Sequence, residues 1–265
     1  MRLLAQLGDS FFAFLRYLGE LAFLARDVGE SLLRGNRRWP QLFRQIAEIG
    51  YRSQPVVIIT GGFTGAVLAA QALFQFQLVG METLAGGLVS AAMLRELGPT
   101  ITGLMLAGRV GSSMAAEIGT MKVTEQIDAL RSMAVHPIDY LVTPRFLAMV
   151  ISIPILLAES VVCGIFASYL VGVPLFNVED AIWWENVRKY SSLDDVKIAL
   201  IKGTVFGFLI VVISCHQGLK ASNGAVGVGR GTTNAMVFSS LAILIANFLL
   251  SMLMQMIYPT GFVNT

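Results

Sequence analysis

The sequence predicts an all-α polytopic membrane protein, and two observations lead to that prediction. The chain of 265 residues is 55% apolar, has 14% charged residues and has a mean hydropathy of +0.70, whereas a soluble domain carries about 25% charged residues. Its apolar residues also fall into five long runs, each close to the roughly 20 residues that an α-helix needs to cross a membrane. The net charge of +2, with dispersed basic residues, speaks against a nucleic-acid partner.

The five runs define the expected organisation. Residues 1–54 form a cytoplasmic or interfacial amphipathic region, residues 55–258 form the transmembrane permease domain, and residues 259–265 form a periplasmic tail. The predicted spans cover residues 55–79, 84–108, 146–172, 198–216 and 235–258. Small residues such as Gly61 and Gly65 in the first span predict close packing of helices, either within one chain or between two.

The N-terminal stretch is predicted to form one amphipathic helix. Polar positions such as Glu20 and Asp27 recur at steps of seven or four on one face, and Leu18, Leu21 and Val28 lie largely on the other. This pattern is typical of a helix that lies in the membrane interface. It is equally typical of a helix that packs on other helices of the same protein.

The distribution of Lys and Arg predicts the orientation of the spans. Fourteen of these residues lie in the N-terminal region, in the link between spans two and three, and in the link between spans four and five. The other side has four, diluted by acidic residues: Arg188, Lys189, Lys197 and Lys202. We therefore expect the N-terminus in the cytoplasm and the C-terminus in the periplasm.

A short charged helix is predicted at about residues 118–136, in a cytoplasmic link between two apolar runs. Its apolar stripe comprises Val123, Ile127, Leu130 and Ala134, and the charged residues off that stripe are Lys122, Glu125, Asp128 and Arg131. The spacing of Asp128 and Arg131 allows an ion pair. The segment is too short and polar to span a membrane. It is either a plain connector or a coupling helix that docks into a cleft on a cytoplasmic motor subunit.

Two stretches resemble a known family. They are LRELGPTITGLMLAGRVGSSMAAEIGTMKVTEQIDALRSMAVHPIDYLVTPR, residues 94–145, and GVGRGTTNAMVFSS, residues 227–240. Both resemble the signature of the MlaE/YrbE family of ABC-transporter permeases. Chain length, span number and the N-terminal helix also fit, so the resemblance covers essentially the whole chain. It matches the charged helix before Pro137 to the coupling helix of the family.

The resemblance implies a homodimeric permease for phospholipids in the inner membrane of Gram-negative bacteria, which contributes to the lipid asymmetry of the outer membrane. It implies a cytoplasmic ABC ATPase as partner, a periplasmic hexamer of MCE-domain protein and, in the Mla systems, a small STAS-domain protein. ATP and Mg²⁺ would bind to the ATPase. The chain itself is then expected to be no enzyme and to hold no cofactor.

The candidate lipid-pocket residues lie on the first two predicted spans and are Leu68, Ala72, Gln75, Val79, Arg95, Glu96 and Leu97. Arg95 and Glu96 are ionisable groups within a span, where such groups are costly and usually functional. The alternative is that they are structural charges, satisfied by other helices or by the interface. The residues of the first span share a mostly apolar face, which suits acyl chains and also suits helix packing. The resemblance places these positions in the lipid pocket, with the headgroup near Arg95 and Glu96.

The remaining acidic, glycine-rich, histidine and cysteine positions indicate no further functional site. Glu159, in the third span, is interpreted as a buried acid hydrogen-bonded to a neighbouring helix, in preference to a proton-linked group. The stretch GAVGVGRGTT, residues 224–233, lacks the residue order of a nucleotide-binding P-loop. His136 and His216 lack metal-ligand spacing, Cys163 and Cys215 read as packing residues, and no nucleophile–base pair is evident. No metal or catalytic residue is therefore predicted.

Two other functions stay open at this point. The protein could be an ion-coupled secondary carrier with Glu159 or Glu96 as its proton site, although such carriers usually contain internal repeats and this sequence shows no convincing one. It could also be a non-transporting membrane anchor for an MCE assembly. Subunits that co-purify with the chain would separate these functions from an ABC permease.

Overall fold

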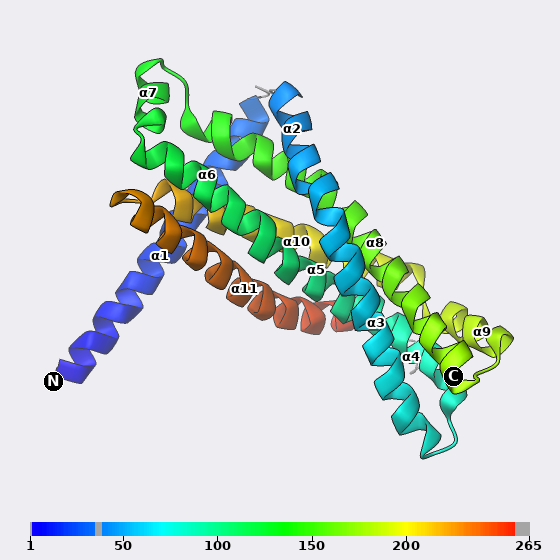
Figure 1. Ribbon diagram of the computed structural model, residues 1–265. Helices are drawn as coiled ribbons and strands as arrows, with labels where there is room; N and C mark the ends of the chain where they lie inside the picture. The colour runs from blue at the N-terminus through cyan, green and yellow to red at the C-terminus, as the bar shows by residue number, and fades with distance from the viewer. Residues whose placement is uncertain (1, 35–38, 258–265) are drawn as a thin grey trace.

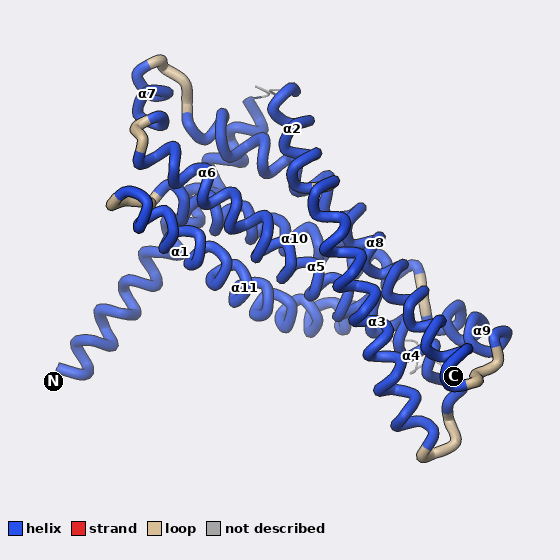
Figure 2. The backbone as a smooth tube through the Cα atoms, in the orientation of Figure 1, coloured by secondary structure: helices blue, strands red, loops and turns tan. Residues whose placement is uncertain are grey.

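A computed structural model describes residues 2–34 and 39–257 of the protein, and all regular elements in these residues are helices. Four helical stretches are long and apolar enough to cross a membrane: Trp39–Gln77, Ile138–Phe176, Leu193–Leu219 and Gly224–Ile257. Figure 2 shows how short the loops between them are. The predicted all-α class with several membrane helices is confirmed. The predicted C-terminal tail, residues 259–265, lies outside the described residues.

The helices on either side of the segmented stretch between residues 77 and 143 are α1 (Arg2–Arg34), α2 (Trp39–Ile49), α3 (Gln54–Gln77), α8 (Thr143–Phe176), α9 (Asp180–Tyr190), α10 (Leu193–Leu219) and α11 (Gly224–Ile257). A 3₁₀ turn, η1 (Tyr51–Ser53), joins α2 to α3 so that the helix of the first predicted span continues back to Trp39. The third and fourth predicted spans, and the fifth as far as Ile257, are likewise parts of longer helices.

The chain between α3 and α8 is helical but segmented. Its elements are η2 (Glu82–Leu84), α4 (Ala85–Ala92), η3 (Met93–Leu97), α5 (Gly98–Leu106), η4 (Ala107–Gly111), α6 (Ser112–Val123), α7 (Gln126–Ser132) and η5 (Ile138–Val142). Three of them, η3, η4 and η5, are π-helical. The second predicted span, residues 84–108, falls in this stretch, whose apolar run is interrupted by Arg95 and Glu96. It is not among the four stretches above, so a fifth span stays a prediction.

Proline explains two of the three π-helical segments. Pro99 follows η3 and Pro144 follows η5, each two residues after the segment ends. Because proline has no N–H and its ring crowds the preceding turn, an α-helix cannot continue through it with regular hydrogen bonds. Widening the helix by one residue relieves this conflict, and such π-helical bulges are frequent at functional sites.

Close contact between α3 and α8 depends on glycine. A Cβ at Gly65 would lie 2.1 Å from the carbonyl oxygen of Gly164, and a Cβ at Gly61 would lie 2.5 Å from that of Ser160. Neither distance is possible between real atoms, so only glycine allows the two backbones to approach so closely. The predicted small-residue packing therefore occurs here within one chain.

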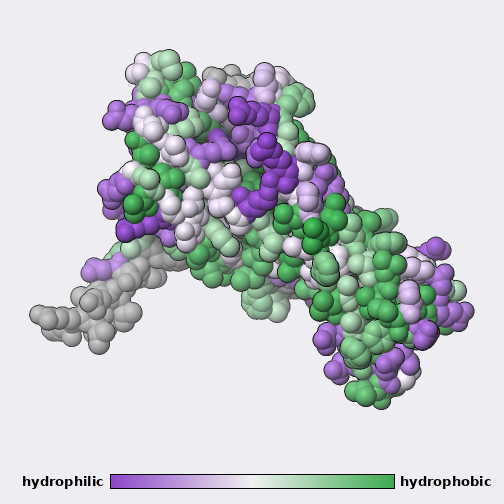
Figure 3. Space-filling view, in the orientation of Figure 1, coloured by the Kyte–Doolittle hydropathy of each residue, from purple (hydrophilic) through white to green (hydrophobic). Residues whose placement is uncertain are grey.

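The long helices run side by side, with α7 at one end of the molecule and α9 at the other (Figure 1). Hydrophilic residues gather over both ends, and hydrophobic residues cover the band between them (Figure 3). The interior holds two apolar clusters. The larger extends from α1, α2 and α7 along α10, and the smaller lies among α3, α4, α8 and α9 around the buried Trp183.

Helix α1 crosses the α7 end of the molecule and then projects away from it toward the N-terminus (Figure 1). Leu24 and Val28 are buried in the larger cluster, and the Ser31 hydroxyl pairs with that of Thr143. Phe12 and Phe23 remain exposed. The C-terminal half of α1 thus packs on its own protein, which was one of the two readings of its sequence, and exposed apolar side chains remain for a membrane surface.

The prediction of one continuous helix over residues 118–136 is wrong. Helix α6 ends at Val123 and α7 begins only at Gln126, because Glu125 has φ +61°. Helix α7 ends at Ser132, two residues before Ala134, which has φ +57°. A residue in the left-handed region cannot continue a right-handed helix. The result is a short separate helix of seven residues at the tip of the molecule.

Candidate functional site

A buried lysine stands at the centre of a polar network between η3, α10 and α11. The ammonium group of Lys202 is 2.9 Å from Glu96 Oε1, and Lys202 as a whole has no exposed surface. Ser251 donates to both carboxylate oxygens of Glu96, and Asn247 Nδ2 donates to Oε2 over 3.1 Å. The Glu96 side chain is 44% exposed. One edge of the carboxylate is therefore held by the protein, and the other edge faces outward.

The proline that widens η3 also explains one contact of Lys202. In an α-helix the N–H of residue 99 would donate to the carbonyl of Arg95, but Pro99 has no N–H. Lys202 Nζ donates to this carbonyl over 2.7 Å and thereby satisfies it. The lysine thus stabilises an irregular helix and positions the Glu96 carboxylate at the same time.

Arg95 is held by a second buried group. Its Nε donates to Oδ1 of Asp195, which is almost fully buried. Asp195 is also the third residue of α10, where its carboxylate accepts from the backbone N–H of Ser192 over 2.8 Å and its own N–H donates to the Ser192 hydroxyl. This reciprocal pair is a capping box. Arg95 is thus paired with a charge on another helix, which is the structural alternative that the sequence left open for this residue.

The partners in this network escaped the sequence analysis. The charge distribution groups Lys202 with the outer side although it falls within the predicted span 198–216, and the structure buries it inside α10. Two signals could have found it. Lys202 and Asp195 are seven residues apart and so share one helical face, and Asn247 and Ser251 are polar residues four apart in the last apolar run. Polar groups at helical spacing inside a span predict an interhelical network.

The other candidate pocket residues are divided between the interior and the surface. Leu68, Ala72 and Leu97 all pack in or against the smaller apolar cluster. Gln75 is exposed on α3, and Val79 is exposed just beyond the end of that helix. Ala72 therefore packs between helices, which was the alternative to lining a pocket. Gln75 and Val79 are available to a ligand or to another chain. A role of these residues in lipid binding stays a prediction.

Helix α7 presents charges outward and an apolar residue inward. Ile127 is fully buried in the larger apolar cluster, so it anchors α7 to its own protein and does not face a partner. Asp128 pairs with Arg131 over 3.1 Å, as its spacing predicted, and also with Lys122 over 3.2 Å across the turn. Met133, just after α7, is exposed. The exposed residues available for docking include Glu125, Asp128, Arg131 and Met133.

The remaining candidates occupy ordinary positions. Gln54 Nε2 donates to Glu159 Oε1 over 2.9 Å from α3 to α8, so the expected bond to a neighbouring helix is present, although Glu159 is only partly buried. The other oxygen of Glu159 is buried without a partner in the described chain. Among the residues that the structure describes, no group of three His, Cys, Asp or Glu is placed to hold a metal ion.

The sequence is similar to known membrane permeases over nearly its full length. The family model described as Permease MlaE matches residues 42–253. A probable ABC transporter permease protein of Rickettsia typhi is 42% identical, with 93% of this chain and 95% of that protein covered. The intermembrane phospholipid transport system permease protein MlaE of Haemophilus influenzae is 34% identical, with 95% and 97% covered. The chloroplastic protein TRIGALACTOSYLDIACYLGLYCEROL 1 of Arabidopsis thaliana is 37% identical, with 86% and 65% covered.

Proposed function

The chain belongs to the MlaE permease family, and we propose that it is the membrane-embedded permease subunit of an ABC transporter that moves phospholipid. The observation that carries this proposal is the family match over residues 42–253, which includes both the Glu96 network and α7. The likeness to the phospholipid permease of Haemophilus influenzae extends over 95% of the chain and supports phospholipid as the substrate.

The proposed topology has five spans, with residues 84–108 as the second. The α7 end lies in the cytoplasm and the α9 end in the periplasm, on the strength of the Lys and Arg distribution. The hydrophobic band between two hydrophilic ends supports an arrangement that spans the membrane, and the orientation rests on the Lys and Arg distribution alone. The membrane is the inner membrane of a Gram-negative bacterium.

Helix α7 and its turn form the contact with the cytoplasmic ATPase. The ion pairs of Asp128 with Lys122 and Arg131 hold a charged surface in a defined arrangement, and the buried Ile127 ties α7 to the larger apolar cluster. A push on α7 would therefore reach α6 and α10 through packed side chains. ATP and Mg²⁺ bind to the ATPase, and α7 supplies the mechanical link to the membrane helices.

The lipid pocket lies where two copies of the chain meet. The outer face of α11 is apolar and exposed beside the Glu96 network, with Phe248, Leu249, Met252 and Leu253 on the surface. A second copy packed there would bury this face and enclose the open edge of Glu96. The Glu96 carboxylate and Gln75 would contact the lipid headgroup, and apolar residues such as Leu68 and Leu97 would line its acyl chains.

The remaining partners are taken from the family resemblance. A periplasmic hexamer of MCE-domain protein exchanges lipid with the permease at the α9 end, and a STAS-domain protein joins the assembly. The assembly as a whole maintains the lipid asymmetry of the outer membrane.

Reconstitution tests the proposal. The chain is purified from its native membrane with its co-purifying subunits and placed in vesicles that carry fluorescent phospholipid in one leaflet. We expect an ATPase to co-purify and ATP to drive movement of the labelled lipid. Movement driven by a proton gradient without any ATPase would instead identify an ion-coupled carrier. An MCE-domain partner without an ATPase, and no lipid movement, would identify an anchor.

A further inference from the structure

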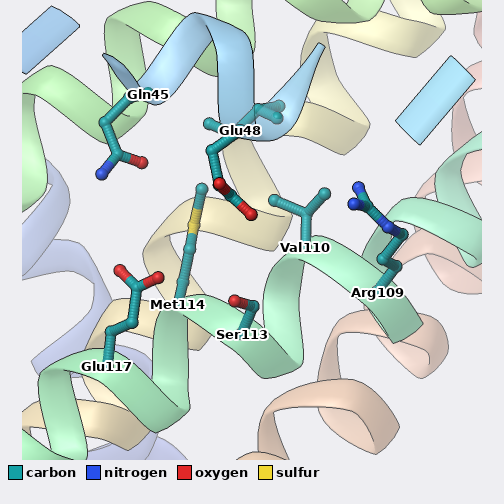
Figure 4. Close-up of a pocket in the computed structure, with 8 residues that line it drawn as sticks. Gln45, Glu48, Arg109, Val110, Ser113, Met114 and Glu117 are labelled. Atoms are coloured by element: carbon teal, nitrogen blue, oxygen red, sulfur yellow. The ribbon is translucent and has the colours of Figure 1, made fainter. Parts of the chain in front are cut away.

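A polar groove lies between α2, α6 and the start of α8, away from the Glu96 network. It consists of two adjoining hollows of about 210 Å³ and 250 Å³ that share Gln45, Glu48 and Glu117 in their walls. Figure 4 shows the carboxylates of Glu48 and Glu117 pointing toward the same space from opposite walls, with Gln45 beside them. A water molecule takes about 30 Å³ of liquid volume, so each hollow has room for a polar group much larger than water. We call this feature the interfacial groove.

The base of the interfacial groove contains a buried cation. Arg145 is 6% exposed and donates to the Leu141 carbonyl over 2.6 Å and to Glu117 over 2.7 Å. Its Nε has no hydrogen-bond partner in the described chain, and neither has the buried Oε1 of Gln41, which lines the same hollow. Buried polar atoms are nearly always satisfied, so unpartnered ones of this kind indicate a missing ligand or water.

The mouth of the interfacial groove carries further charge. Arg44 is exposed there and makes no ion pair with any residue that the structure describes. Glu48 is paired with Arg52 through both carboxylate oxygens, and Glu117 with Arg145 through one. Carboxylates have about four acceptor positions each, so both retain capacity for another donor. The groove therefore offers cations for an anionic group and carboxylates for a cationic group within one small space.

The outer face of α2 indicates the depth of the groove relative to the membrane. Trp39 and Phe43, one turn apart on α2, and Tyr51 in η1 just after it are all exposed. Exposed Trp and Tyr on a membrane protein gather at the level of the lipid headgroups. Gln41, Gln45 and Glu48 lie on the opposite side and face the groove. Helix α2 thus turns aromatic residues to the bilayer and polar residues to a cavity at headgroup depth.

We propose that the interfacial groove binds the headgroup of a phospholipid with a primary ammonium group, taken from the leaflet at the α7 end. The phosphodiester lies against Arg44 and Arg145, where charge-assisted hydrogen bonds favour it. The ammonium group donates to Glu48 and Glu117. A quaternary ammonium group has no N–H to donate, so phosphatidylcholine binds more weakly. This second lipid site goes beyond the proposed function, which concerns lipid held beside Glu96.

Photo-crosslinking tests the proposal in the full transporter, reconstituted in nanodiscs of phosphatidylethanolamine or of phosphatidylcholine. A photoreactive amino acid replaces Gln45, which faces the groove, or Phe43, which faces the bilayer and serves as the control. We expect a phosphatidylethanolamine adduct at position 45, and about tenfold less of it with Arg44→Glu, the loss that one charge-assisted hydrogen bond would give. The adduct at position 43 should not change, which would show that Arg44→Glu leaves the fold intact.

Three outcomes would overturn the proposal. Equal adducts at position 45 in both nanodiscs would show that the ammonium group is not recognised. Loss of the adduct on addition of millimolar inorganic phosphate would identify a site for a free anion. A crosslink from position 45 to a co-purified protein would identify a protein-docking surface. Because these readouts do not use lipid movement, they stay separate from the test of the proposed function.

Discussion

The ammonium group of Lys202 has three acceptors and no contact with water. It donates to the Ser251 hydroxyl, to the Glu96 carboxylate and to the Arg95 carbonyl. The Arg95 carbonyl lacks its usual helical donor because residue 99 is proline. Replacing it by methionine leaves these acceptors without their donor, and a buried acceptor left unsatisfied costs about 1–3 kcal/mol. We expect Lys202→Met to lower the unfolding temperature in detergent and to reduce lipid movement.

The matched control for this prediction is Lys197→Met, one and a half helical turns earlier on α10. Lys197 pairs with Asp194 on the exposed surface, and surface substitutions change stability by no more than about 0.5 kcal/mol. Equal stability of the two variants would show that the buried ammonium group does not hold the network together.

The carboxylate of Glu20 ties α1 to the end of α10. It contacts Lys220, lies 3.1 Å from His216 Nε2 and lies 3.5 Å from Arg16 on its own helix. The hydrogen bond from Lys220, followed by that from His216, lowers the pKa of Glu20 below its ordinary value of 4.5. Because the pKa is lowered when α1 packs on α10, the ionised carboxylate stabilises this packing at pH values above the ordinary pKa. The stabilisation is lost as the pH falls through the folded-state pKa.

We therefore expect α1 to loosen from α10 in acid, at a pH below about 4.5. Spin labels at Ala22 and Ser222 should report a narrow distance distribution at neutral pH that broadens in this range. Glu20→Gln should give a broad distribution at every pH. If the wild-type distribution stays narrow while the rest of the protein remains folded, then Glu20 does not dock α1.

The crossing of α3 and α8 depends on the absence of a single side chain. A Cβ at Gly65 would lie 2.1 Å from a backbone oxygen of α8, whereas a Cβ at Gly62 would have its nearest neighbour at 3.9 Å. We expect Gly65→Ala to destabilise the protein by about 1–3 kcal/mol, because the helices must move apart. Gly62→Ala on the same helix should be neutral or stabilising, since alanine favours helix. Thermal unfolding of the two variants measures the difference, and similar values for both would show that the close crossing is not required.

Helix α7 is short, and its surface is set by the ion pairs of Asp128. Reversing the charges of Glu125 and Asp128 together places like charges beside Lys122 and Arg131. We expect ATP hydrolysis by the assembled transporter to lose its stimulation by lipid, while the membrane helices stay folded. The control reverses Glu179 and Glu185, exposed residues at the α9 end. Unchanged assembly and unchanged ATP hydrolysis in the α7 variant would exclude a coupling role.

The molecule has two hydrophilic ends separated by a hydrophobic band, with α7 and the α10–α11 turn at one end and α9 at the other. If the α7 end is cytoplasmic, a cysteine at Glu185 should react with an impermeant reagent from outside. A cysteine at Ser222 should react only after the membrane is permeabilised. The experiment uses a background without Cys163 and Cys215, the free cysteines of the chain. The reverse labelling pattern would invert the orientation and with it the ATPase contact at α7.

Sequence alone was enough for properties that depend on local composition and spacing. The helical class follows from apolar runs of membrane length, the Asp128–Arg131 pair follows from helical spacing, and the family follows from a long shared motif. Each of these depends on residues close together in the chain, so no knowledge of distant contacts was needed.

Tertiary structure decided which partner each buried group meets. Lys202 falls within the predicted span 198–216 and is grouped with the charges of the outer side, but it becomes the centre of a network because α10 brings it to Glu96, more than a hundred residues earlier. The helix expected over residues 118–136 breaks at Glu125, and the sequence does not show that Ile127 belongs to the core. The interfacial groove joins residues from three separate helices, α2, α6 and α8. Charges within a low-dielectric band must find partners wherever the fold brings them, and this requirement, unlike helix formation, cannot be met by neighbours in the sequence.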